Sequence, residues 1–315
     1  MRKITNRRKI LAAIFVALLS FFLTNCAVRE PSKSEKPITR IQSADRWQTL
    51  QVDQKKRWYL LYVPTTYDAG TPVPLVLNFH GSRSNPDAQL AYSDFKSLAD
   101  EKGFIAALPY GEYQKERGMN SWNTVNDPDG VDDVQFVRNI IYDLSTRYAI
   151  DPKRIYATGM SGGARMASRL ACELDDVLAA VAPVAGVQFP SDCRASRAVP
   201  MIAFHGKDDK VNTYVHTSES RDYWTAGVED SLSGWVEKNG CAQNPEILSV
   251  SDVVARVSWE NCRDDAEIVF YRIADGGHTW PGSSIVLSTP WSGKTNQDIV
   301  ASHLIWEFFE AHPLP

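Results

Sequence analysis

The sequence predicts an α/β fold in which helices flank a mainly parallel sheet. Short apolar runs typical of buried strands alternate along the chain with segments whose apolar residues recur at helical spacing. The chain has 315 residues and is 43% hydrophobic, which is enough to bury one large core, and α/β folds of this length are commonly single domains. We find no internal repeat and no glycine-rich nucleotide-binding fingerprint in the sequence.

The predicted elements follow one another in this alternating order. In the segment 162–174, for example, Met166, Leu170 and Leu174 recur at the spacing of one helix face, directly after a strand-like run. The predicted strands are 58–63, 75–79, 104–108, 154–158, 179–185, 201–204 and 268–273, and the predicted helices are 88–102, 134–148, 162–174 and 296–310.

The N-terminal segment 1–26 is predicted to be a signal peptide. Basic residues precede a largely apolar run at 10–23, which is short for a membrane span. Cys26 ends a stretch that resembles the bacterial lipobox, although Asn25 stands where a small residue is usual. We expect lipidation of Cys26 and export to the periplasm or cell surface, with ordinary secretion or an uncleaved anchor as the alternatives. Residues 27–44 are predicted to form a polar tether and 45–315 the catalytic domain.

The stretch YATGMSGGARMASRLAC, residues 156–172, places Ser161 between glycines where a strand-like run ends and a helical pattern begins. Serine at such a position is often only a helix cap. The strand, turn and helix context also matches the G-x-S-x-G elbow, in which a sharp turn exposes a nucleophilic hydroxyl. In that interpretation the Gly162 amide, at the start of the helix, faces a developing oxyanion.

A nucleophilic serine needs a base, and in α/β-hydrolases the chain order is serine, acid, histidine. The sequence contains six histidines, of which His80 and His205 precede any possible acid after Ser161 or end strand-like runs. His303 falls within a helical pattern, and His216 and His312 lie in segments that favour solvated roles. His278 instead stands in a loop directly after the strand-like run 268–273, which makes it the candidate base.

The acid is expected in the loop after the run 201–204. Asp208 and Asp209 are adjacent there, and spacing alone does not choose between them.

These segments together resemble the secreted α/β-hydrolase esterases grouped as feruloyl esterases and polyhydroxybutyrate depolymerases. The elbow with its Met-Ala-x-x-Leu-Ala-Cys helix, an HG-x-x-D acid loop at 205–209 and the GGHTWPG loop at 276–282 occur in the family's order, and the resemblance spans roughly residues 57–312. It implies an α/β-hydrolase fold with Ser161, Asp209 and His278 as the catalytic triad. The acid loop carries more charge than the family's usual one, so the resemblance does not settle the substrate.

The same resemblance and the elbow geometry suggest the rest of the site. Backbone amides of Gly162 and of Ser82, which follows the predicted strand 75–79, are the expected oxyanion donors. The candidates for walls of the substrate pocket are Trp122, Tyr214, Trp224, Trp280 and Trp291.

Cysteine usage indicates an oxidising compartment. Apart from Cys26 the chain has four cysteines, which allow three pairings. Local closure favours Cys172 with Cys193 and Cys241 with Cys262, and the family resemblance suggests the same pairs. A metal site is the weaker interpretation, because the sequence has no C-x-x-C or H-E-x-x-H spacing.

Charge argues against a polyanionic partner. Without residues 1–25 the chain carries 29 basic and 38 acidic residues, a net charge of −9, which disfavours nucleic acid.

We expect a cofactor-free serine carboxylic ester hydrolase that acts through an acyl-enzyme on soluble esters, with feruloyl-type or short acyl esters preferred. A polyhydroxybutyrate or hydroxyalkanoate oligomer depolymerase is the main alternative, and a serine peptidase or a non-catalytic glycan-binding module are others. The sequence leaves the oligomeric state open.

Overall fold

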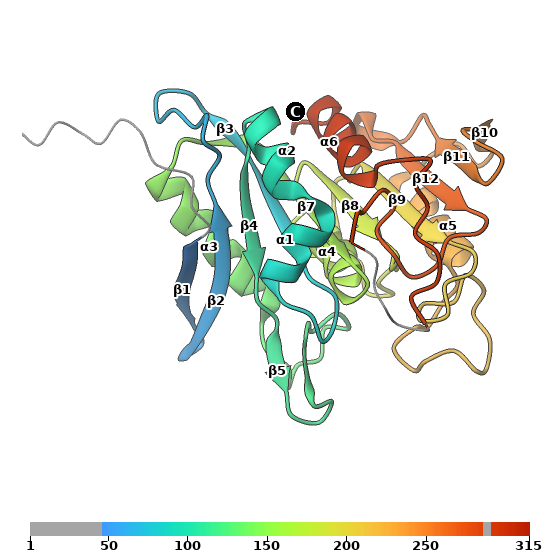
Figure 1. Cartoon of the computed structure of the whole chain (residues 1–315), viewed down its shortest axis with the longest axis horizontal. Coiled ribbons are helices and arrows are strands. Elements are labelled where there is room, and N and C mark those ends of the chain that lie inside the picture. The colour runs from blue at the N-terminus through green and yellow to red at the C-terminus, as the bar shows by residue number, and fades with distance from the viewer. Residues whose placement is uncertain (1–45, 286–290) are drawn as a thin grey trace, which may run out of the picture. The chain divides into compact units, whose positions relative to one another are not determined.

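The computed structural model describes residues 46–285 and 291–315 (Figure 1). The predicted signal peptide, Cys26 and the tether lie outside the described residues. The strands are β1 (Arg46–Val52), β2 (Lys55–Tyr62), β3 (Val73–Phe79), β4 (Ile105–Pro109), β5 (Glu112–Gln114), β6 (Met119–Ser121), β7 (Ile150–Met160), β8 (Ala180–Val184), β9 (Met201–Gly206), β10 (Glu246–Ser249), β11 (Val254–Trp259) and β12 (Ile268–Ile273). The helices are α1 (Pro86–Ser93), α2 (Phe95–Lys102), α3 (Asp133–Arg147), α4 (Gly162–Glu173), α5 (Val228–Asn239) and α6 (Ala301–Ala311), with a short 3₁₀ turn η1 (Arg263–Asp265).

Ten of these strands form one sheet in the order β1-β2-β4-β3-β7-β8-β9-β12-β11-β10. The central strands, β4 to β12 in that order, pair in parallel, whereas β1, β2, β11 and β10 add antiparallel edges. Strands β5 and β6 form a separate hairpin. The predicted α/β class with a mainly parallel sheet is therefore confirmed.

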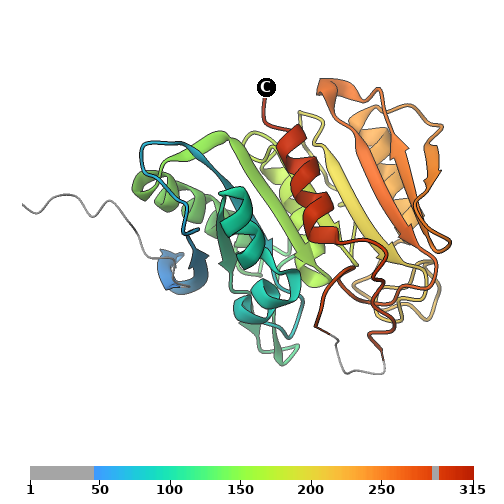
Figure 2. The same cartoon turned by 45° about the horizontal axis from the view of Figure 1, so that its top comes forward.

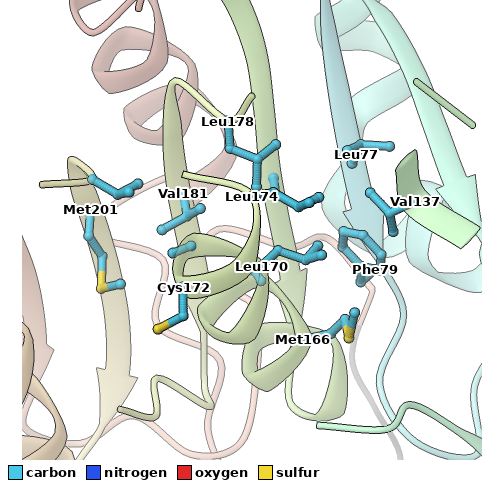
Figure 3. Close-up of a cluster of buried hydrophobic side chains, with 14 of the residues drawn as sticks. Leu77, Phe79, Val137, Met166, Leu170, Cys172, Leu174, Leu178, Val181 and Met201 are labelled. Carbon is cyan, nitrogen blue, oxygen red and sulfur yellow. The ribbon is translucent and has the colours of Figure 1, made fainter. Parts of the chain in front are cut away.

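Helices cover both faces of the sheet. Helices α1, α2 and α6 lie on one face and α3, α4 and α5 on the other (Figures 1 and 2). Side chains alternate along each strand, so Leu77 packs into one core cluster while Val76 packs into the other. Figure 3 shows Met166 and Leu170 on the side of α4 that faces Phe79 and Leu77 of β3. This packing holds the start of α4 against the middle of the sheet.

Several predicted elements differ in the structure. The single helix expected at 88–102 is two helices, because Asp94 adopts a left-handed conformation with φ 52° that interrupts the helical hydrogen bonds. The helix expected from residue 296 begins at Ala301, after the extended residue Val300. Helix α5 and the edge strands β1, β10 and β11 were not predicted. All four residues of β10 are exposed, including the adjacent Ile247 and Leu248, so the strand has no buried face that would give an alternating apolar pattern.

Both expected disulfides are present, Cys172 with Cys193 and Cys241 with Cys262. Each pair closes a short local loop, since the two cysteines are 21 residues apart in both cases. Disulfides of this kind persist in oxidising compartments, which agrees with export. Among the described residues, no helix is long and apolar enough to span a membrane.

Candidate active site

The candidate site lies where the order of the strands reverses. From β3 the chain passes to β4 on one side of it and then to β7 on the other. In open parallel sheets the loops at the carboxyl ends of strands beside such a switch point form the usual ligand crevice. Ser82, Ser161, Asp209 and His278 all follow parallel strands, namely β3, β7, β9 and β12, so they lie along the same edge of the sheet.

Ser161 occupies a strained turn between β7 and α4. Its backbone has φ 57° and ψ −115°, and its amide donates to the Val184 carbonyl at 2.9 Å. Left-handed φ values in residues other than glycine are uncommon and concentrate at functional sites. Within the described part of the chain, the Ser161 hydroxyl makes no capping hydrogen bond to α4. The cap interpretation of this serine is therefore wrong, and its hydroxyl is available.

The glycines after Ser161 allow close approach to the loop that follows β3. A Cβ atom at Gly163 would overlap the Phe79 carbonyl oxygen. A Cβ atom at Gly162 would lie 2.5 Å from Ser82 Oγ and 3.1 Å from the Ser82 backbone nitrogen. Glycine is required at 163, whereas a side chain at 162 would displace the Ser82 side chain. The short contact at Gly162 places the Gly162 and Ser82 backbones side by side next to Ser161.

Two buried side chains, Asp209 and His278, form the candidate acid and base pair. Asp209 Oδ2 lies 2.7 Å from His278 Nδ1, and Asp209 Oδ1 accepts hydrogen bonds from the amides of Val211 at 2.7 Å and Asn212 at 2.8 Å. Because a carboxylate only accepts, the hydrogen of His278 resides on Nδ1. In the neutral imidazole, Nε2 is then left free to accept a proton.

The Asp209 carboxyl remains ionised although it is only 2% exposed. Burial raises its pKa, but the electrostatic interaction with His278 and hydrogen bonds from His205 and His278 outweigh this and leave the pKa well below its usual value. His205 Nε2 lies 3.3 Å from Asp209 Oδ2 and 2.8 Å from the Asn212 carbonyl oxygen. His205 therefore contacts the same carboxylate oxygen as His278 and also links the acid loop to the Asn212 carbonyl.

The side chain of Asp208, the other candidate acid, does not contact His278. Its side chain is exposed, and only its backbone amide bonds to this region, donating to the Gly276 carbonyl at 2.9 Å. The acid loop and the histidine loop pack so closely that a Cβ atom at Gly206 would overlap the Gly276 carbonyl oxygen. This packing points Asp209 inward and leaves Asp208 outside, as the family resemblance implies.

His80 supports the turn that carries Ser82. Its Nε2 accepts from the Gly111 amide at 2.9 Å and its Nδ1 lies 2.7 Å from the Gly81 carbonyl oxygen, to which it donates. Burial lowers the pKa of His80 to about 4, so the ring is neutral at neutral pH. Since the Gly81 carbonyl and the Ser82 amide belong to one planar trans peptide and point in opposite directions, the bond to Gly81 orients the Ser82 N–H.

The structure corrects most of the pocket-wall candidates. Trp122, Trp224 and Trp280 are each 1% exposed, which leaves almost no ring surface for a ligand. Trp122 packs 4.9 Å from His80 and donates to its carbonyl, and Trp224 packs 5.9 Å from His205.

Trp280, Tyr214 and Trp291 differ in how much of the ring is exposed. Trp280, which lies within the histidine loop, packs against Phe95 and donates to Ser302. Tyr214 is 8% exposed and its hydroxyl donates to Glu229. Trp291 is 64% exposed and is the one of the five with a ring open to solvent. Sequence patterns do not separate supporting aromatics from pocket aromatics, because both are large apolar residues in loops.

Sequence reasoning also passed over residues that the structure brings to the site. His205 directly follows the predicted strand 201–204 and Arg165 stands within the elbow stretch, and neither is predicted as a site residue. Arg165 could have been recognised from the sequence, because it is a charged residue among the small and apolar residues that begin α4. Within the described residues, no group of three or more histidine, cysteine, aspartate or glutamate side chains could hold a metal ion.

The family model and the relatives reported next are all described as esterases. A family model described as "Esterase PHB depolymerase" matches residues 57–228, more than half of the chain. Feruloyl esterase B of Piromyces equi is 28% identical over 231 residues, which cover 70% of this chain but only 42% of that protein. Feruloyl esterase D of Neurospora crassa is 26% identical over 275 residues, covering 83% of this chain and 84% of that one.

Among solved structures, the acetyl xylan esterase from Aspergillus awamori superposes with a TM-score of 0.56 at 17% identity, covering 74% of this chain and 94% of that chain. At this identity the likeness concerns the fold, which is the α/β-hydrolase fold.

Proposed function

The chain belongs to the Esterase PHB depolymerase family, and from this premise we propose that it is a serine carboxylic ester hydrolase. In this proposal Ser161 is the nucleophile, His278 the general base and Asp209 the residue that orients the base. The observation that carries the proposal is the strained Ser161 with an uncommitted hydroxyl, at the same sheet edge as the Asp209–His278 pair.

The first step follows from the tautomer of His278. With its hydrogen held on Nδ1 by Asp209 at 2.7 Å, Nε2 takes the proton of the Ser161 hydroxyl as the serine oxygen attacks the ester carbonyl. The imidazolium that forms is stabilised by the ionised Asp209, whose depressed pKa keeps it charged throughout.

The oxyanion of the tetrahedral intermediate is bound by the backbone amides of Gly162 and Ser82. The closeness of these two residues beside Ser161 and the orientation of the Ser82 amide by His80 support this assignment. Such donors are in place before charge develops, so they need no reorganisation during the reaction.

Collapse of the intermediate expels the alcohol, which takes the proton from His278, and leaves an acyl-enzyme on Ser161. Water, deprotonated by His278, then attacks the acyl carbonyl and releases the acid through a second oxyanion. No cofactor is needed for these steps.

We propose soluble esters as substrates, with feruloyl-type or short acyl esters first and hydroxybutyrate oligomers second. The names of the feruloyl esterase relatives favour the first class, and the family description favours the second. Trp291, with its exposed ring, remains the aromatic candidate for contact with a flat acyl group.

The test uses purified enzyme and its Ser161→Ala variant on methyl ferulate, a short nitrophenyl ester, a hydroxybutyrate trimer and an amide analogue. We expect ester hydrolysis by the wild type, little action on the amide, and a loss of several orders of magnitude in Ser161→Ala without loss of fold. An active, folded Ser161→Ala protein would overturn the mechanism. A trimer preference of about tenfold over methyl ferulate, which is about 1.4 kcal/mol, would reverse the order of the substrates.

We also propose that the protein is exported and anchored by lipid at Cys26. The disulfides support export, and the stretch that ends at Cys26 supports the anchor.

A further inference from the structure

Arg165 is a buried cation close to the candidate nucleophile. It lies on the first turn of α4, its amide donates to the Ser161 carbonyl at 3.1 Å, and it is 4% exposed. A Cβ atom at Gly162 would lie 3.6 Å from Arg165 Nη2, so the guanidinium lies beside the backbone that presents one of the proposed oxyanion amides.

This guanidinium lacks the carboxylate partner that buried arginines usually have. Among the described residues three arginines are buried: Arg57 pairs with Asp133, Arg169 pairs with Glu173, and Arg165 has no carboxylate within ion-pair distance. Burial lowers the pKa of Arg165 to about 10, which still leaves it charged at neutral pH.

The contacts of Arg165 are neutral and incomplete. Nη1 donates to Asn212 Oδ1 at 3.3 Å, and the guanidinium stacks on the Tyr223 ring at 4.4 Å. Nε is buried and has no hydrogen-bond partner among the described residues. Burying an unpaired charge is costly, so an incompletely satisfied guanidinium at a reaction centre indicates a ligand that completes it.

Arg165 also borders a cavity of about 320 Å³. Gln188, Thr225 and Phe189 contribute to its lining, which offers polar groups and one aromatic ring. Two carboxylates also line the cavity, but neither pairs with Arg165. Glu173 forms an ion pair with Arg169, and the exposed Asp192 accepts a hydrogen bond from Asn126 at 3.2 Å. The lining of the cavity includes Arg165 but not Ser161 or His278. It therefore has room for a part of the substrate beyond the reacting ester, next to a guanidinium that has no carboxylate partner.

We propose that Arg165 binds a carboxylate carried by the ester substrate. This inference rests on the proposed function and refines it, because it requires an anionic group a short distance from the ester bond. Guanidinium groups bind carboxylates through paired, charge-assisted hydrogen bonds, and desolvation strengthens them. The negative net charge of the chain disfavours polyanionic partners, but Arg165 offers one buried positive charge that could pair with a single carboxylate.

The experiment compares esters that differ only in charge. On the acyl side, 4-nitrophenyl hydrogen adipate is paired with its primary amide. On the alcohol side, the 3-hydroxybutyrate dimer with its free carboxylate is paired with the amide of the same dimer. The ratio of kcat/KM for the charged ester to that for the neutral ester is measured for the wild type, Arg165→Gln and Arg165→Lys. Arg154→Gln, which removes the same charge from a partly exposed ion pair in β7, is the matched control.

We expect the wild type to prefer the charged member of at least one pair, and the responding pair identifies the side of the ester that carries the carboxylate. Arg165→Gln should lower that ratio by about tenfold or more, mainly through a higher KM for the charged member. Arg165→Lys should be intermediate because lysine keeps the charge without the paired geometry, and Arg154→Gln should keep the wild-type ratio.

A wild-type ratio at or below one for both pairs would overturn the proposal, and this holds even if the Arg165 variants do not fold. An equal loss on charged and neutral esters in folded Arg165→Gln would assign the residue a structural role through Asn212 and Tyr223 instead. Failure of the wild type to hydrolyse either neutral ester would count against the esterase mechanism itself, which separates the two hypotheses.

Discussion

Replacement of Asp209 by asparagine is expected to inactivate the enzyme while leaving it folded. Oδ1 accepts the amides of Val211 and Asn212, and Oδ2 faces His278 Nδ1 at 2.7 Å. An asparagine must keep its oxygen toward the two amides, because an NH₂ group cannot accept them. Its NH₂ group then meets Nδ1 of His278, so the imidazole hydrogen moves to Nε2 and the base can no longer accept the proton of Ser161.

The expected loss is large because the wrong tautomer removes the base altogether. In a serine protease triad the same substitution lowers kcat by about 10⁴, which corresponds to about 5.5 kcal/mol in the barrier. The loss of a charged hydrogen bond should also lower the free energy of unfolding, by about 1.5 to 3 kcal/mol. Asp208→Asn is the matched control. Its side chain is exposed and its only bond to the site comes from the backbone, so we expect kcat within about twofold of the wild type, as for surface changes in general.

The assay is the kcat on a short nitrophenyl ester for the wild type, Asp209→Asn and Asp208→Asn, with circular dichroism and urea unfolding to establish that each is folded. A folded Asp209→Asn protein that keeps more than about a tenth of the wild-type kcat would refute the tautomer argument. Greater damage from Asp208→Asn would mean that the acid loop is shifted by one residue.

Three further predictions concern stability and export. Removing one disulfide by Cys172→Ser with Cys193→Ser should lower the free energy of unfolding by about 3 kcal/mol in urea titrations, given a separation of 21 residues, and an unchanged midpoint would contradict this. The pKa of His80 is about 4 in the folded protein and about 6.5 in the unfolded chain, so the unfolded state takes up the proton first as the pH falls. The free energy of unfolding is therefore fully kept above pH 6.5 and falls by about 3 kcal/mol as the pH is lowered to 4. His80→Gln should be less stable at pH 7 but lose less between pH 6.5 and 4, and a slope equal to the wild type would disprove the assignment. Labelled fatty acid should be incorporated by the wild type and not by Cys26→Ser, whereas a processed, unlabelled wild type would indicate simple secretion.

Local sequence was sufficient where function depends on a short, contiguous arrangement. The elbow around Ser161 needs a strand, a turn of small residues and a helix in immediate succession, and all of this is visible in one stretch. The loop that carries His278 is likewise a compact motif after a strand. The disulfides could be predicted because each closes a short loop. Short apolar runs predicted the central strands, whereas exposed β10 and the helix break at Asp94 had no such signal.

The sequence by itself thus determined the α/β class, the candidate nucleophile and base, and the cysteine pairs. Only the tertiary structure decided that Asp209 rather than Asp208 faces His278, that most of the aromatic candidates are buried supports, and that Arg165 lacks a carboxylate. These properties depend on contacts between distant parts of the chain, since Asp209 and His278 are 69 residues apart and Arg165 and Asn212 are 47 apart. The burial of a side chain and its hydrogen-bond or ion-pair partners are set only when such segments pack together, so they cannot be predicted from a local sequence pattern.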